Sequence, residues 1–239
     1  MTLHNYIDMI KVTKIRIYIL ALFGVLFMLS SSCKKKDNTP SHLTITDIDG
    51  NVYHTVTIGT QLWMVENLKT TKFNDNTAIP MVTDSTAWMN LITPGVCWYN
   101  NDAGAYKNTC GALYNSFAVN TGKLAPIGWH IPTDAEWTIL TTYLGGDSIA
   151  GGKLKETGTT HWQSPNTGAT NETGFTAIPG GYRTSNGSFS RINYFGYWWS
   201  VSEAVTGYVW SRGIYNNYNN VFRGNVSKND GFSVRCLRD

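Results

Sequence analysis

The fold is decided by one stretch in the middle of the chain, APIGWHIPTDAEWTIL at residues 125–140. Thr133 is followed three residues later by Glu136. This spacing is typical of a capping box, in which each side chain satisfies a backbone N–H at the start of a helix. Asp134 adds a negative charge at the end where the helix dipole favours one. We therefore predict a helix that begins after Thr133 and ends at the glycine pair of residues 145–146, because glycine commonly ends helices.

One side of this helix is predicted to be buried. Trp137, Leu140 and Leu144 recur at the i, i+3 and i+7 spacing that places side chains on a single helix face. His130 lies just before the helix, beside Trp129, in a segment that reads as extended. Because no nucleophile motif accompanies His130, we predict a hydrogen-bonded structural residue. A chemical site built on this histidine is the alternative.

The N-terminal segment has the features of an export signal. Residues 15–29 are an apolar run, IRIYILALFGVLFML, with basic residues before it, which is the order of a signal peptide. The run is shorter than the ~20 apolar residues of a typical transmembrane helix. Small residues then lead to Cys33, which resembles a bacterial lipobox, although Ser30 stands where Leu is usual. We predict that residues 1–32 are a lipoprotein signal peptide and that Cys33 is lipidated. An ordinary signal peptide or an anchor helix is the alternative, and Met9 is an alternative start.

Residues 33–43 are predicted to form a lipid-anchored flexible tether, because they are polar, include Pro40 and show no apolar periodicity. The three lysines of this segment would lie against anionic headgroups. The membrane, reached through the lipid anchor, is therefore a predicted partner. The predicted location is the cell envelope after export, with the membrane leaflet left open.

Composition favours an exported, β-rich domain over residues 44–239. Hydrophobic residues make up 42% of the chain and charged residues only 15%, below the usual quarter. The formal net charge of +3 arises in the leader, since residues 1–36 hold six basic residues and one acidic residue, whereas the remainder holds 13 basic and 15 acidic residues. The charge therefore gives no reason to expect a nucleic-acid partner.

Alternation of apolar and polar residues predicts a β-hairpin with a tight turn at Asp49-Gly50. An EF-hand calcium loop is excluded there, because the further oxygen ligands and the closing Glu do not follow. Later strands are predicted at 197–202, 207–214, 220–226 and 231–237, and a second short helix at about 150–157.

Three cysteines remain once Cys33 carries the lipid: Cys97, Cys110 and Cys236. An oxidising exported compartment makes a disulfide the default. Cys97 and Cys110 close the shortest loop, so we predict that they are bonded, which would add ~3 kcal/mol in the chain-entropy model, and that Cys236 is free. Scattered cysteines without a C-x-x-C pair do not have zinc spacing. No metal and no cofactor are predicted.

Six motifs occur in order along the chain: DIDGNVYHTVTIGTQLWMVENLK, CWYNND, IGWHIPTDAEW, GFTAIPGGYR, GYWWS and GFSVRCLRD. Together they resemble the Fibrobacter succinogenes major paralogous domain family, which is found in exported and lipid-anchored proteins of Bacteroidetes and related bacteria. The resemblance covers roughly residues 44–239. It implies a fold and a cellular setting, and it implies no particular activity.

The fold that the resemblance implies is α+β and related to the C-type-lectin-like fold and, distantly, to formylglycine-generating enzymes. Mixed β-sheets, two short helices, long loops and paired N- and C-terminal strands are expected. Family members often place a cysteine where Ala125 stands, able to pair with the cysteine of the last strand, so Cys236 lacks that partner here. The residues taken as a structural motif are Trp63, Trp129, His130, Thr133, Glu136 and Trp137.

Two function classes follow. The first is a non-catalytic binding module for a glycan or an envelope protein, and the alternative is a formylglycine-generating-type enzyme, or a scaffold derived from one, whose chemistry uses a cysteine pair and a metal. Aromatic and amide residues mix in YVWSRGIYNNYNN at residues 208–220. Trp210, Tyr215 and Tyr218 are the predicted ligand contacts, and burial of these aromatics in a core is the competing interpretation. The chain has no EPN- or QPD-like run, so glycan binding is expected to be calcium-independent.

Overall fold

The computed structural model describes residues 43–239, which lie in one compact unit, His42–Asp239. The predicted signal peptide, Cys33 and all of the predicted tether except Leu43 lie outside the described residues. The strands, in chain order, are β1 (Thr44–Thr46), β2 (Val52–Ile58), β3 (Gln61–Met64), β4 (Val96–Cys97), β5 (Leu113–Tyr114), β6 (Trp129–His130), β7 (Tyr182–Arg183), β8 (Phe189–Ser190), β9 (Phe195–Val205), β10 (Tyr208–Tyr215), β11 (Val221–Ser227) and β12 (Leu237–Arg238). The helices are α2 (Ser85–Met89), α3 (Ala103–Cys110), α4 (Ser116–Val119), α5 (Asp134–Tyr143) and α6 (Asp147–Leu154), with a 3₁₀ turn η1 at Tyr99–Asn101.

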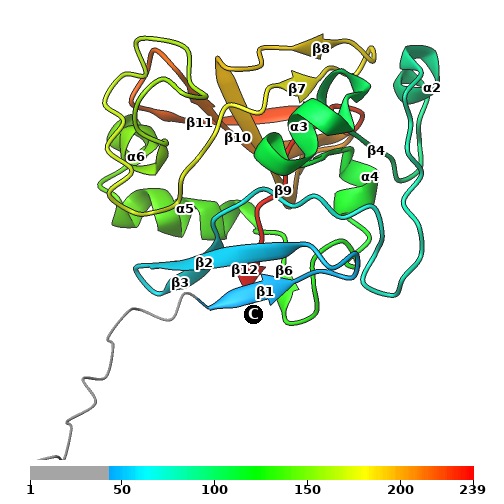
Figure 1. The fold of residues 1–239 in the computed structure, drawn as a ribbon, viewed down its shortest axis with the longest axis horizontal. Helices are drawn as coiled ribbons and strands as arrows, with labels where there is room; N and C mark the ends of the chain where they lie inside the picture. The colour runs from blue at the N-terminus through cyan, green and yellow to red at the C-terminus, as the bar shows by residue number, and fades with distance from the viewer. Residues whose placement is uncertain (1–42) are drawn as a thin grey trace, which may run out of the picture. The chain divides into compact units, whose positions relative to one another are not determined.

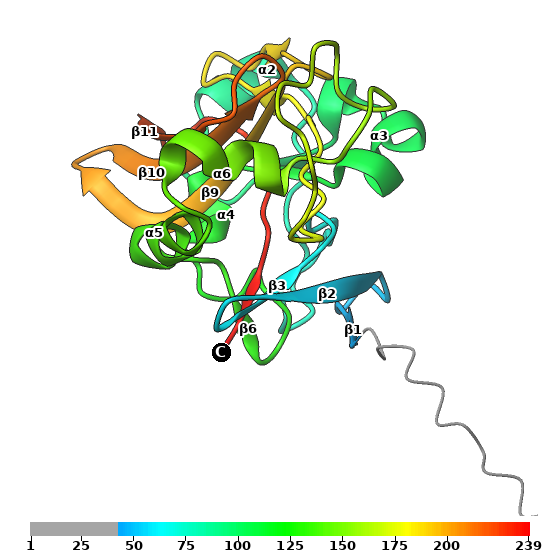
Figure 2. The same ribbon diagram turned by 90° about the vertical axis from the view of Figure 1, so that its left-hand side faces the viewer.

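These elements form an α+β fold, as predicted (Figure 1). The five-stranded sheet has the order β1-β2-β3-β12-β6, and the three-stranded sheet has the order β11-β10-β9. Two short ribbons, β4-β5 and β7-β8, complete the sheets of the described residues. All strand pairs within these four sheets are antiparallel. The view in Figure 2 shows β1, β2 and β3 at one end of the unit and α2 at the other.

The predicted first hairpin is confirmed. β1 pairs with β2, and Asp47 closes the turn between them, since its Oδ1 accepts the backbone N–H groups of Asp49 and Asn51, each at 2.9 Å. Gly50 has a φ of +81°, a conformation that favours glycine. Asp47 is therefore occupied by its own turn.

The last strand completes the sheet that the first hairpin begins. Leu237 of β12 is in register with Trp63 of β3 on one side and with His130 of β6 on the other. The predicted pairing of the N- and C-terminal strands is wrong, because β1 is the edge strand and pairs with β2 alone, although β1 and β12 belong to the same sheet. β12 pairs with β3 instead, because β2 occupies only one edge of β3 and leaves its other edge available.

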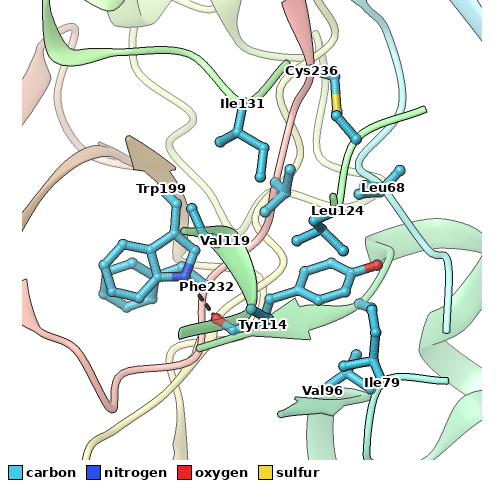
Figure 3. Close-up of a cluster of buried hydrophobic side chains, with 14 of the residues drawn as sticks. Leu68, Ile79, Val96, Tyr114, Val119, Leu124, Ile131, Trp199, Phe232 and Cys236 are labelled. Carbon is cyan, nitrogen blue, oxygen red and sulfur yellow. Dashed lines mark hydrogen bonds between the residues drawn. The ribbon is translucent and has the colours of Figure 1, made fainter. Parts of the chain in front are cut away.

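Two apolar clusters lie on opposite sides of β9. Trp198 and Trp199 are neighbours in this strand, and successive strand residues point to opposite faces. Trp199 lies in the cluster shown in Figure 3, where its Nε1 donates to the carbonyl oxygen of Tyr114 at 2.7 Å. Trp198 lies in the other cluster with Trp137 and Leu140 of α5. The three-stranded sheet is therefore covered by core on both faces over part of its length.

The predicted capping box is present at the start of α5. Thr133 Oγ1 accepts from the backbone N–H of Glu136 at 3.2 Å, and Glu136 Oε2 accepts from the backbone N–H of Thr133 at 2.8 Å. The helix ends at Tyr143, and Gly145 follows with a φ of +97°. Both predicted ends of this helix are thus confirmed.

The second predicted helix is found as α6, three residues earlier than expected. Its glycine pair allows a close approach to a neighbouring loop, because a Cβ on Gly151 would lie 2.3 Å from the carbonyl oxygen of Asn220. Helices α2, α3 and α4 were not predicted. They are four to eight residues long, too short to show an apolar period. Across residues 43–239, no helix has both the length and the apolar character that crossing a membrane requires.

Candidate functional site

The three predicted ligand contacts do not share one surface. Trp210 lies on the face of the three-stranded sheet that packs against α5, and the Arg223 guanidinium stacks 3.4 Å from its ring centroid while also pairing with Asp134 of α5. Tyr215 lies five residues later in β10, so it points to the opposite face. Tyr218 accompanies Tyr215, with ring centroids 6.4 Å apart. The structure therefore brings two of the three residues together.

Tyr215 and Tyr218 belong to a contiguous group of rings, here called the aromatic face, which comprises Phe195, Tyr197, Tyr215, Tyr218 and Phe222. The Tyr215 ring is held between Phe195 and Phe222, with centroid distances of 4.1 and 4.4 Å. The hydroxyls of Tyr197 and Tyr215 are hydrogen bonded at 2.6 Å. Four of these side chains are half-buried, and Tyr218 is 49% exposed.

A glycine at the centre of the aromatic face makes this arrangement possible. Gly213 is in register with Tyr197 on β9 and with Phe222 on β11. A Cβ at this position would lie 2.8 Å from Tyr197 Cε1 and 3.1 Å from Tyr215 Cε1. The rings of Tyr197 and Tyr215 therefore lie over Gly213, where no side chain separates them, and together they form a continuous platform.

A buried lysine fixes the turn that carries Tyr218. Lys155 is fully buried, and its Nζ donates to the carbonyl oxygens of Thr167 at 2.7 Å, Tyr218 at 2.9 Å and Tyr215 at 3.3 Å. No carboxylate of residues 43–239 forms an ion pair with it, and burial lowers its pKa to about 8. Sequence reasoning missed this residue, because only the fold brings residues 155 and 215–218 together.

Both ring nitrogens of His130 are paired inside the protein, and the ring lines one wall of a hollow of about 180 Å³. Nδ1 lies 2.7 Å from Asp239 Oδ1, and Nε2 lies 3.0 Å from Glu136 Oε1. Burial alone would lower the pKa of His130, but the hydrogen bonds and charges of these two carboxylates outweigh it and raise the pKa. Trp63 and Trp137 are fully buried beneath the same sheet, with ring centroids 4.8 Å apart. Both ring nitrogens of His130 are therefore occupied, and the ring ties the start of α5 to the chain end. Trp129, beside it, is half-buried.

The predicted Cys97–Cys110 disulfide is wrong for this structure. Cys97, Cys110 and Cys236 are all free and buried. Cys97 packs with Trp88, Tyr99 and Leu113, whereas Cys110 ends α3 and lines a different hollow. Loop length estimates only the chain entropy of a bridge and says nothing about where the two thiols point. Burial raises the pKa of Cys97 to about 12 and that of Cys110 to about 11, and it also raises the pKa of Cys236.

A cleft that sequence reasoning missed lies between α3 and the loop after α6. It consists of two hollows of about 190 and 330 Å³ that share Thr109, His161 and Ile178. The Nδ1 atom of His161 lies 2.8–2.9 Å from both carboxylate oxygens of Glu156, so this ring has a fixed orientation. Arg235, fully buried, lies beneath the larger hollow. Within residues 43–239, no three His, Cys, Asp or Glu side chains are grouped to hold a metal ion.

Comparison with known proteins gives one match. The family model described as the Fibrobacter succinogenes major domain matches residues 56–238. No curated protein and no solved structure matches the chain. The match begins near the end of β2 and spans most of the described residues, including the capping box, the aromatic face and the last strand. The chain therefore belongs to the Fibrobacter succinogenes major domain family.

Proposed function

We propose that this protein is a non-catalytic binding module, exported and lipid-anchored through Cys33 to the cell envelope, and that it contacts a glycan through the aromatic face. The observation that carries the proposal is that the five rings of the aromatic face are contiguous and partly exposed, with Tyr218 49% exposed. Binding sites combine apolar and aromatic surface with a few placed polar groups. The aromatic face has that composition and is braced from behind by Lys155.

Support for a glycan comes from the polar groups around the rings. A sugar ring offers apolar C–H faces that suit aromatic rings and hydroxyls that need hydrogen-bond partners. The turn beside Tyr218 supplies amides, with Asn217 exposed and Asn219 and Asn220 half-buried. The Arg191 guanidinium lies over the Phe195 ring at 5.3 Å. A protein ligand is the second candidate for the same surface.

Enzymatic thiol chemistry is the alternative function. A reactive cysteine needs an accessible thiolate, which a lowered pKa provides. The three described cysteines are buried and their pKa values are raised. This state supports the binding proposal over the enzyme. We also propose that the fold is a relative of the C-type-lectin-like fold, which is supported by the meeting of the first hairpin and the last strand in one sheet.

A glycan array probed with the chain from residue 34 onward tests the proposal. We expect binding to a subset of glycans, and a calcium chelator should not change it. Tyr218→Ala should weaken the affinity about tenfold or more, as for a residue at the centre of a contact. Tyr208→Ala is the matched control, because Tyr208 is 48% exposed at the other end of β10. Equal binding by both variants, or binding of no glycan by the wild type, would contradict the proposal. A ligand whose mass changes on incubation would favour the enzyme.

A further inference from the structure

Three exposed apolar side chains cluster at the end of the unit where the described chain begins. Ile48 and Ile127 line a hollow of about 190 Å³ together with Thr46. Val52 is the strand partner of Thr46. Ile48, Val52 and Ile127 are 45%, 51% and 85% exposed. We call these three residues the apolar tip.

The apolar tip carries little unpaired charge. The carboxylate of Asp47 accepts hydrogen bonds from Asn51 and from the Tyr53 hydroxyl. Asp75 forms an ion pair with Lys123 at 2.8 Å. Charges that are already satisfied cost less to bring to a low-dielectric boundary than free ones. The surface is therefore suited to an apolar neighbour.

The length of chain between Cys33 and β1 indicates that this apolar neighbour is the lipid bilayer. Ten residues, 34–43, separate Cys33 from Thr44, and a fully extended chain of that length reaches about 35 Å. A globular unit of about 200 residues measures about 40 Å across. Thr44 is only two residues from Thr46, which borders the apolar tip. A lipid on Cys33 thus keeps the apolar tip within reach of the bilayer, whereas the far end of the unit is not.

We propose that the apolar tip docks on the lipid bilayer to which the chain is anchored, with Ile127 entering the headgroup boundary. This inference rests on the lipid anchor of the proposed function. Apolar side chains that enter the interface add buried apolar area to that of the lipid anchor, and they fix which end of the unit faces the membrane. Figures 1 and 2 place β1 and the three-stranded sheet apart, so docking at the apolar tip leaves the aromatic face clear of the membrane.

The test compares two exposed isoleucines. Ile92 is 81% exposed and follows α2, which both views place at the end away from β1. Ile127→Cys and Ile92→Cys can each be labelled selectively with a polarity-sensitive fluorophore, because the native cysteines of the described chain are buried. The chain from residue 34, with a histidine tag ahead of Lys34, is captured on vesicles of phosphatidylcholine, phosphatidylglycerol and a nickel-chelating lipid. The tag replaces the natural anchor, so a failure of lipidation does not affect the result.

We expect a blue shift and several-fold stronger quenching by nitroxide lipids for the label at 127 than for the label at 92. A second measurement uses unlabelled, untagged protein and the same vesicles. The double variant Ile48→Ser, Ile127→Ser should partition to the vesicles more weakly than the wild type, whereas Ile92→Ser should partition equally. Equal quenching at both positions would overturn the proposal. So would a label at 127 that is shielded on whole cells but exposed on pure lipid, since that result indicates a protein partner.

Discussion

Around His130 the polar side chains pair with one another, whereas around Tyr218 the same kinds of side chain remain partly exposed and largely unpaired. His130 has a carboxylate at each ring nitrogen, and the two tryptophans beneath are fully buried. The aromatic face satisfies only its inner hydroxyls, through the Tyr197–Tyr215 bond, and leaves Tyr218 at the surface. The difference indicates that residue type does not distinguish a structural corner from a binding surface. What distinguishes them is how completely the polar groups are satisfied inside the protein.

The largest expected effect is on the buried tryptophans near His130. Trp137→Ala should lower the free energy of unfolding by ~3–5 kcal/mol, because it empties a fully buried site that contacts Trp63 and Phe175. Trp210→Ala is the control, since Trp210 is half-buried and covered on one side by Arg223, and it should cost clearly less. Urea melts of both variants give the comparison. If Trp137→Ala melts like the wild type, the corner is not part of the core.

A second substitution connects the two regions through the fold. Lys155→Met should cost about 2 kcal/mol, because it removes a charged, buried donor that three backbone carbonyls share. It should also release the turn that positions Tyr218, so ligand binding should fall with stability. Lys153→Met is matched in sequence but removes only a surface pair with Glu172, which is worth ~0–1 kcal/mol. Equal melts for the two variants would show that Lys155 does not hold the turn.

The helix cap should have a smaller effect. Thr133→Ala removes the acceptor for the Glu136 N–H and one half of the capping box, and loss of an N-cap side chain typically costs ~1 kcal/mol. Thr142→Ala, inside the same helix on its exposed side, is a control that leaves the cap intact. Thermal melts should rank Thr133→Ala between Thr142→Ala and Trp137→Ala. A cost as large as that of Trp137→Ala would assign the cap a role beyond the helix.

The smallest effect depends on pH. Because the pKa of His130 is raised in the folded protein, protonated His130 stabilises the fold fully below the unfolded value of ~6.5, and this contribution is lost as the pH rises through the raised folded pKa. His130→Gln should therefore differ from wild type most at about pH 5–6 and least at alkaline pH. The side chain is one-third exposed, so we expect less than ~1 kcal/mol. A variant that keeps its stability at pH 5.5 but loses all ligand binding would mark His130 as a site.

Local patterns were enough to predict the elements that depend on neighbouring residues. The capping box, the glycine end of α5, the first hairpin and the strands β9, β10 and β11 follow from spacings of two to four residues. The short helices were missed, although Asp84, Asp102 and Asn115 cap them with their side chains. Capping residues were therefore the usable signal for helices too short to show a period.

Contacts between distant segments could not be predicted in the same way. Lys155 meets the turn at Tyr215–Tyr218 only because α6 packs beside it, and the cysteine pairing depended on side-chain directions that chain length does not contain. The separation of Trp210 from Tyr215 is a different case. An odd spacing of five residues within one strand places side chains on opposite faces, so alternation alone was sufficient to divide the predicted site.

The three buried thiols have a consequence for how the protein matures. No disulfide joins any two parts of residues 43–239, so the stability of this folded unit does not depend on the surrounding redox potential. Folding of this unit needs neither an oxidant nor an isomerase that sorts disulfides, and a reductant should not unfold it. The native state of residues 43–239 should therefore persist under reducing conditions, because packing, hydrogen bonds and ion pairs hold it without a covalent bridge.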